Sequence, residues 1–174
     1  MMKSMKGQYF SFDAIIATVI MVLATTSLVA YWFGVESVVE ARNNSLHDDA
    51  MRIAESLVTP GVPENWPAVG LENTYQIGLA DGYANELNKT AIETLGNLAN
   101  PAVSTGNYTA VGTILKAPAL YFIRIEQVDD CAPLACINYS IGNESAQSAG
   151  EVAVAHRGAS IGRVPVRVTV FLGN

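Results

Sequence analysis

The sequence predicts an α+β protein: a long N-terminal α-helix, first hydrophobic and then amphipathic, followed by a small domain with short helices and a mainly antiparallel β-sheet. Three observations support this prediction. A block of 22 residues from Ala14 to Val35 carries no charged side chain. The residues after this block repeat apolar side chains at helical spacing. From about residue 120 the apolar period changes to two, which is typical of strands.

The apolar block is long enough to cross a membrane as a helix. At a rise of about 1.5 Å per residue it spans roughly 33 Å, and the hydrocarbon core of a bilayer is about 30 Å thick. Aromatic rings, which favour the headgroup level, stand at both ends of the block. They are Tyr9, Phe10 and Phe12 before it and Tyr31, Trp32 and Phe33 at its far end. A secretory signal would have a shorter apolar region and a small-x-small cleavage site, so we predict a helix that is retained.

Charge predicts the orientation of this helix. Lys3 and Lys6 precede the block, whereas the first charged residue after it is Glu36. By the positive-inside rule, the N-terminus stays in the cytoplasm and the chain beyond residue 36 lies outside. The predicted organisation is a cytoplasmic leader at 1–12, a transmembrane helix at 13–35, an amphipathic extension at 36–58 and an extracytoplasmic domain at 59–174.

The helical extension ends near Thr59, because Pro60 and Gly61 break a helix. Its apolar face packs on its own domain, on neighbouring subunits of an assembly, or on both. An irregular connection rich in proline follows from Thr59 to Asn73, and we expect Trp66 to pin it to the domain.

Short helices and strands are predicted in the rest of the domain. Leu87–Leu98 is amphipathic, with Thr90 and Glu93 at the spacing of a capping box, and Tyr108–Leu115 is a second short helix. Strands are predicted at 120–128, 136–141, 151–157 and 163–172. In the last strand, alternate valines share one face while Arg167 and Thr169 share the other, so we expect one buried face and one wet face.

Composition argues against several function classes. Two of the ten basic and one of the sixteen acidic residues precede residue 36, so the ectodomain carries eight basic and fifteen acidic side chains. It has no basic cluster to bind phosphates, and we expect no nucleic acid partner. His47 and His156 are the only histidines, so we predict neither a metal site nor a cofactor. His156 is the one candidate base for a hydrolase, and no nucleophile pairs with it recognisably.

Two kinds of extracytoplasmic modification are predicted. Cys131 and Cys136 are the only cysteines, and an even pair in an exported domain favours a disulfide that staples the turn between two strands. Five Asn-x-Ser/Thr sequons are candidate glycosylation sites. Their acceptor residues are Asn43, Asn88, Asn107, Asn138 and Asn143. Asn88 and Asn107 also suit helix starts, which is the alternative explanation for these two residues.

Asp13 is an ionisable residue at the edge of the apolar block. A carboxylate there is costly unless it stays at the interface or finds a partner. Two explanations are open: Asp13 caps the helix at its positive end, or it pairs with a group on another chain.

The start of the chain resembles a known family. Met-Lys-Gly-Gln-Tyr-Phe-Ser-Phe-Asp-Ala-Ile-Ile-Ala, from Met5 to Ala17, joins a basic leader, Lys-Gly, a Gln-containing start, an acidic residue and an apolar helix. In this it resembles archaeal type IV pilin-like precursors with a class III signal peptide. The resemblance implies that a prepilin peptidase cuts between Gly7 and Gln8, and that the apolar helices pack in the core of a filament. It also implies that Asp13 pairs with the N-terminal amine of a neighbouring subunit, although Asp13 would be the sixth mature residue and the family usually has its acidic residue at the fifth.

We therefore expect a structural subunit, major or minor, of a type IV pilus-like cell-surface filament or a related export machine, and not an enzyme. The expected partners are the membrane, a prepilin peptidase and other pilin-like subunits. The alternative is an unprocessed single-pass protein of the cell membrane whose ectodomain binds a ligand or a partner. An enzyme that uses His156 is the third hypothesis.

Overall fold

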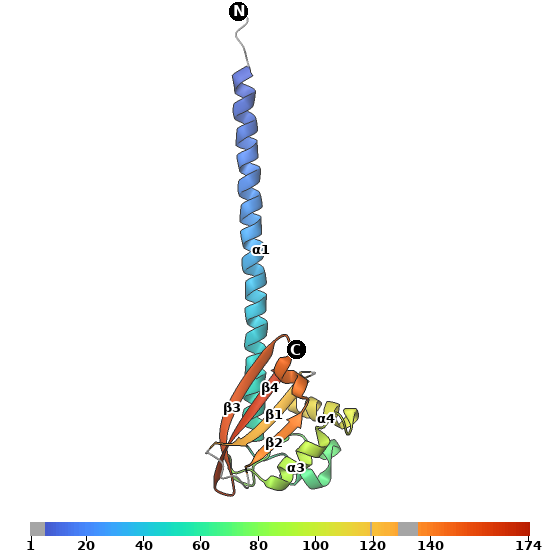
Figure 1. The fold of residues 1–174 in the computed structure, drawn as a ribbon. Coiled ribbons are helices and arrows are strands. Elements are labelled where there is room, and N and C mark those ends of the chain that lie inside the picture. The colour runs from blue at the N-terminus through green and yellow to red at the C-terminus, as the bar shows by residue number, and fades with distance from the viewer. Residues whose placement is uncertain (1–5, 119, 129–135) are drawn as a thin grey trace, which may run out of the picture. The chain divides into compact units, whose positions relative to one another are not determined.

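The computed structural model describes residues 6–118, 120–128 and 136–174, without the side chains of 6–11 and 40–44. It divides into two units, Met1–Arg42 and Asn43–Asn174, which we describe separately. Both units contain part of α1, an α-helix over Lys6–Leu57 (Figure 1). The helix ends one residue before the predicted end of its extension.

The domain combines short helices with one sheet, which confirms the predicted α+β class. Its helices after α1 are α2 (Trp66–Val69), η1 (Leu71–Asn73), α3 (Lys89–Leu98), α4 (Thr105–Leu115) and η2 (Glu144–Ser148), where η marks a 3₁₀ helix. Its strands are β1 (Leu120–Gln127), β2 (Asn138–Gly142), β3 (Val152–Ile161) and β4 (Val164–Gly173).

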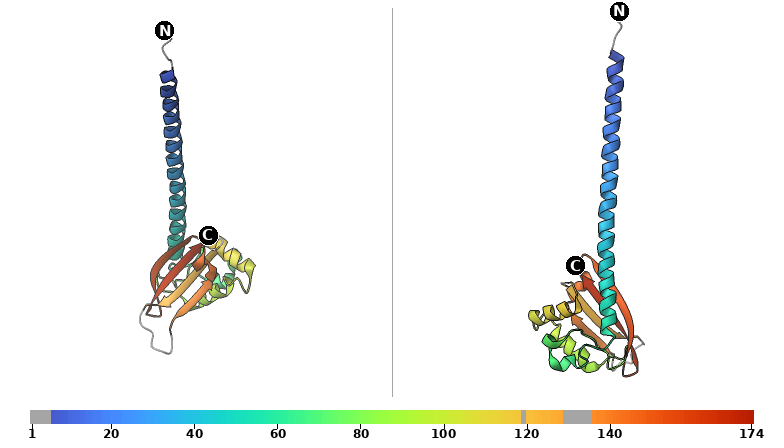
Figure 2. Two further views of the ribbon diagram at one scale, coloured as in Figure 1. Left: turned by 45° about the horizontal axis from the view of Figure 1, so that its top comes forward. Right: turned by 180° about the vertical axis from the view of Figure 1, so that it is seen from behind.

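The four strands form a sheet in the order β2-β1-β4-β3, in which every neighbouring pair is antiparallel (Figure 2). The strands β2 and β3 are therefore its two edges. Gly162 and Arg163 join β3 to β4 with φ of 54° and 77°. Two successive positive φ values make a turn whose twist matches that of the strands it connects.

One face of the sheet is covered by the last turns of α1 together with α3 and α4 (Figure 2). Alternate residues of β1 and β4, such as Ile123 and Val170, are buried there against Leu46 and Ile53 of α1. The predicted burial of the alternating valines is confirmed for Val166, Val168 and Val170. The apolar face of the helical extension thus packs on its own domain.

The connection after α1 contains α2 and η1, neither of which was predicted. Trp66 is buried, and its Nε1 donates a hydrogen bond of 2.7 Å to the carbonyl of Gly78. The expected role of Trp66 is confirmed. Gly78 is required at this point because a Cβ there would collide with the carbonyl oxygen of Thr59.

The start of α3 differs from its prediction. The cap is Asn88, whose Oδ1 accepts the backbone N–H groups of Thr90 and Ala91 at 2.8 and 3.4 Å. Thr90 therefore lies inside the helix, and the capping box with Glu93 is wrong. The alternative explanation for Asn88 as a helix start is confirmed.

The second face of the sheet is only partly wet, contrary to prediction. Thr169 is 3% exposed and Phe122 is 1% exposed, because η2 packs against β1 and β4 on this side. The rings of Phe122 and Phe171 lie 5.9 Å apart, and the guanidinium of Arg124 stands 5.6 and 5.7 Å from their centroids. Arg124 also donates to Gln147 of η2 at 2.9 Å. The five residues of η2 are small or polar, which is typical of a loop. The sequence therefore did not predict that they cover this face of the sheet.

Candidate membrane-spanning segment and sites on the domain

The apolar part of α1 is the most distinctive feature of the N-terminal unit. Phe12–Val39, a segment of 28 residues that contains an 18-residue stretch with a mean hydropathy of 2.1, is long and apolar enough to cross a membrane. It is slightly longer than the predicted segment, 13–35. Its large side chains are uncovered; Tyr31 and Trp32, for example, are 70% and 69% exposed. So much apolar surface is costly in water but not in lipid.

The threonine side chains of this segment are satisfied within the helix. The hydroxyls of Thr18, Thr25 and Thr26 each donate to the carbonyl four residues earlier, at 2.8, 2.9 and 2.8 Å. A hydroxyl that bonds in this way carries no unmet donor into hydrocarbon. The threonines are therefore compatible with a lipid environment.

Asp13 does not cap α1. The helix begins at Lys6, so Asp13 lies in its third turn, and the first turn contains no acidic residue. The favourable field of a helix N-terminus fades within that first turn. The capping explanation is therefore wrong. The side chain of Asp13 is exposed, and it makes no hydrogen bond or ion pair with the described part of the chain.

The expected processing site lies at the start of α1. The backbone of Gly7 and Gln8 is helical and belongs to the first described turn of α1. Cleavage between Gly7 and Gln8 stays a prediction.

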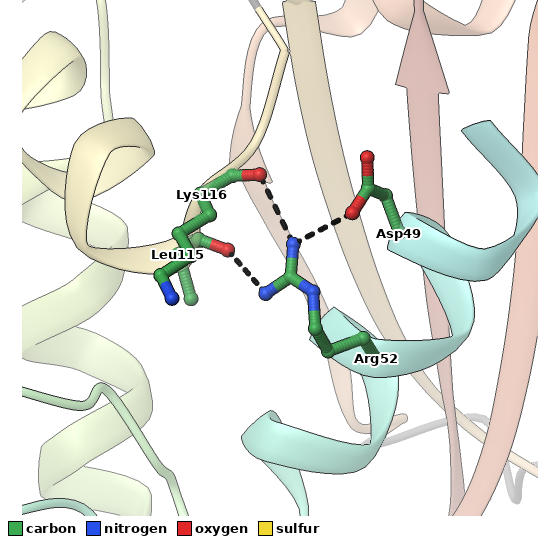
Figure 3. A network of polar contacts seen from close by, with 4 residues as sticks. All are labelled: Asp49, Arg52, Leu115 and Lys116. Carbon is green, nitrogen blue, oxygen red and sulfur yellow. Dashed lines mark hydrogen bonds and ion pairs between the residues drawn. The ribbon is translucent and has the colours of Figure 1, made fainter. Parts of the chain in front are cut away.

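Arg52 fixes the last turns of α1 to the end of α4 (Figure 3). Its Nη1 donates to the carbonyl of Leu115 at 2.9 Å, and its Nη2 donates to the carbonyl of Lys116 at 3.1 Å. Asp49 holds the same Nη2 from one turn earlier at 3.0 Å. Carbonyls at a helix C-terminus lack partners and carry partial negative charge, so a cation stabilises them. Arg52 was not singled out in the sequence because its partners are backbone atoms more than sixty residues away.

A buried tyrosine pair joins α4 to β1. The rings of Tyr108 and Tyr121 are stacked, with centroids 4.4 Å apart and an interplanar angle of 2°. Tyr121 Oη donates to the carbonyl of Tyr108 at 2.9 Å, and the backbone N–H of Tyr121 donates to Tyr108 Oη at 3.0 Å. Burial raises the pKa of both phenols. The two hydroxyls are therefore neutral donors and acceptors that lock the helix to the sheet.

The sequons occupy different local structures. Asn88 and Asn143 cap α3 and η2 through their Oδ1 atoms. Asn107 lies within the first turn of α4, whose cap is Ser104, so Asn107 is not a helix cap as suggested. Asn138 begins β2 and is exposed. The side chain of Asn43 lies outside the described set.

The predicted disulfide and the candidate base have different outcomes. Cys131 lies outside the described residues, so its pairing with Cys136 stays a prediction. His156 is exposed and stands in the middle of β3, which continues to Ile161 beyond the predicted strand end at residue 157. Its Nδ1 lies 3.0 Å from Oγ1 of Thr169 on β4. This contact links two strands and gives the imidazole no carboxylate to orient it as a base.

A groove of about 610 Å³ lies beside Arg52. Met51 and Glu55 of α1 form one wall, and Ile114 of α4 forms another. Tyr75, which is 85% exposed, forms a third. In the described residues, no three histidine, cysteine or acidic side chains come together as a metal site would require.

Comparison of the chain with protein-family models, with curated proteins and with solved structures finds no match.

Proposed function

We propose that the chain is a membrane-anchored structural subunit, major or minor, of a type IV pilus-like cell-surface filament or a related export machine, with its domain outside the cytoplasm. The observation that carries this proposal is Asp13. A carboxylate at the edge of an apolar segment stays at the membrane interface or finds a partner, and capping of its own helix does not supply one. A partner on another chain would allow Asp13 to leave the interface.

The N-terminal amine of a neighbouring subunit fits this requirement. After a cut between Gly7 and Gln8, the amine of the same chain lies five residues before Asp13, about 7.5 Å along the axis and roughly 140° around it. It is therefore on a different side of the helix. A second copy, shifted along the first, brings its own amine beside the carboxylate. Two opposite charges then satisfy each other in a medium of low dielectric constant.

The exposed apolar side chains of Phe12–Val39 support the same arrangement. A helix that leaves lipid must cover such side chains, and identical helices packed in a filament core cover one another. The domain remains outside this core because the last turns of α1 already bury their apolar face on it.

The mature N-terminus tests the proposal most directly. We expect mass spectrometry of the protein recovered from cells to show a chain that begins at Gln8. We also expect mechanical shearing to release it in filaments. A chain that keeps Met1 and stays entirely with the membranes would contradict the proposal.

Asp13→Asn tests assembly separately from processing. The amide keeps the size of the side chain and removes its charge, so we expect cleavage and membrane insertion to continue and sheared filaments to be lost. Glu64→Gln, at an exposed acidic position of the domain, is the matched control and should leave filaments at the wild-type level. Normal assembly of the Asp13→Asn variant would remove Asp13 from the proposal.

The groove beside Arg52 favours a second candidate function, an unprocessed surface protein whose ectodomain binds a ligand. Its exposed Tyr75 and its charged rim, with Asp48 and Lys116, offer an aromatic and polar surface. The N-terminal measurement separates the two candidates, because an unprocessed chain retains residues 1–7.

A further inference from the structure

The strand β2 presents an open edge of the sheet. Gln127 N–H bonds to the carbonyl of Ile137, and Asn143 N–H bonds to the carbonyl of Tyr121. Odd-numbered residues of β2 therefore exchange hydrogen bonds with β1, whereas the backbone groups of its even-numbered residues point away from it. These outward groups have no backbone hydrogen-bond partner among the described residues.

This edge lacks the usual protection against another strand. Proteins place charged residues or proline on exposed edges, or cover them, because an open edge can pair with another chain. β2 reads Asn-Tyr-Ser-Ile-Gly and contains neither a charge nor a proline. The other edge, β3, is closed at one end. There Leu87 N–H bonds to the carbonyl of Ser160 at 2.7 Å, and Ser160 N–H bonds to the carbonyl of Asn85 at 2.8 Å.

The same strand carries a sequon in an accessible form. Asn138 and Ser140, the first and third residues of the sequon, are both exposed. Residues two apart in a strand share one face, so the amide and the hydroxyl stand side by side toward solvent. Neither side chain makes a hydrogen bond within the described structure.

In each of the other described sequons, one side chain makes a hydrogen bond that stabilises the local structure. Asn88 uses Oδ1 to cap α3, and its Nδ2 donates to Asp81 at 3.3 Å. Asn143 caps η2 through a bond of 3.0 Å from the N–H of Ser145. In the sequon of Asn107, the Thr109 hydroxyl donates to the helix carbonyl of Thr105 at 2.9 Å. Asn138–Ser140 is the described sequon in which neither the amide side chain nor the hydroxyl is engaged in such a bond.

We infer that Asn138 carries an N-linked glycan and that this glycan shields the open edge of β2. In the modification, Nδ2 of Asn138 loses a proton and forms a bond to the anomeric carbon of a glycosyl phosphate donor. The C–O bond of the donor breaks, and its electron pair leaves with the phosphate. The bulky, hydrated sugar then stands beside this edge and obstructs the approach of an added strand. The inference depends on the extracytoplasmic placement of the domain in the proposed function.

Peptide mapping tests the modification. We expect the full-length protein from its native membranes to yield the peptide that contains Asn138 with the added mass of a glycan. Asn138→Gln and Ser140→Ala should each abolish that mass shift, whereas Asn88→Gln should not. An unmodified Asn138 peptide would overturn the inference.

Substitutions at Ser140 test the shielding. Ser140→Ala removes the sequon and leaves the edge bare, so we expect the detergent-solubilised protein to shift from monomer to dimer or larger in size-exclusion chromatography. Ser140→Lys also removes the sequon but places a charge on the edge, so we expect it to remain monomeric. If Ser140→Ala stays monomeric, the glycan has no role in shielding the edge.

The outcomes also separate this inference from the proposed function. Glycans on other sequons with none on Asn138 would overturn the inference and leave the extracytoplasmic domain intact. A chain with no glycan, whose domain also resists protease added outside intact cells, would overturn both.

Discussion

Two isoleucines on α1 show how different the two units are. Ile20 is 61% exposed in the apolar segment, whereas Ile53 is 1% exposed in the last turns of the helix. Both residues lie in the same secondary structure element. Near Ile53, the sheet provides a protein core, whereas the described residues provide none around Ile20. Burial within the chain therefore stabilises the protein at Ile53 but not at Ile20.

The largest expected difference comes from truncating these two residues. Ile53→Ala should lower the free energy of unfolding of the domain by about 2–5 kcal/mol, because it leaves a cavity in the core. Ile20→Ala should leave domain unfolding unchanged. Denaturant titration in detergent measures both, with the fluorescence of buried Trp66 as the probe in a Trp32→Phe background. Equal effects of the two substitutions would show that Ile53 contributes no more to the stability of the domain than Ile20.

A smaller effect is expected at Arg52, where the last turns of α1 meet α4. Arg52→Ala should destabilise the domain by about 1–2 kcal/mol, because two helix-end carbonyls lose a charged donor. Lys89→Ala is the control: its ion pair with Glu93 is 3.7 Å long and exposed, and its loss should cost about 0.5 kcal/mol or less. The same titration measures both, and a neutral Arg52→Ala would show that water replaces the guanidinium.

The smallest effect is a dependence of domain stability on alkaline pH. Folding raises the pKa of Tyr108 and Tyr121 above the ordinary value of 10.0. The folded state therefore holds these protons more tightly, and stability is complete below pH 10 and falls as the pH rises above it. We expect the midpoint temperature of thermal unfolding to be lower at pH 11 than at pH 8, and Tyr121→Phe to reduce this difference.

Tyr75→Phe is the control for this prediction, because Tyr75 is 85% exposed. It should retain the full decrease seen in the wild type. If Tyr121→Phe keeps the same decrease, the buried pair is not its source.

Much of the domain was predictable because local patterns specify it. The break at Pro60, the alternating valines of β4 and the anchoring role of Trp66 each follow from residues near one another in the chain. The starts of α3 and α4 were less accurate, since several neighbouring polar residues compete to cap a helix. The choice among them depends on how the preceding loop approaches.

The candidate sites, too, were predictable only where local sequence patterns specify them. Asp13 and the sequons were found from the sequence, but their surroundings were not. The start of α1 at Lys6 removed the capping role of Asp13, and the path of β2 left Asn138 and Ser140 exposed. The contacts of Arg52 and of the tyrosine pair join distant segments, so no local pattern announced them.

The sequence by itself determined the apolar helix, its aromatic ends and the α+β order of the domain, because hydrophobic period and chain-breaking residues act over a few positions. The tertiary structure alone decided which polar groups are satisfied and which remain available. Hydrogen bonding and burial depend on partners brought together by folding, as the buried Thr169 and the open edge of β2 show.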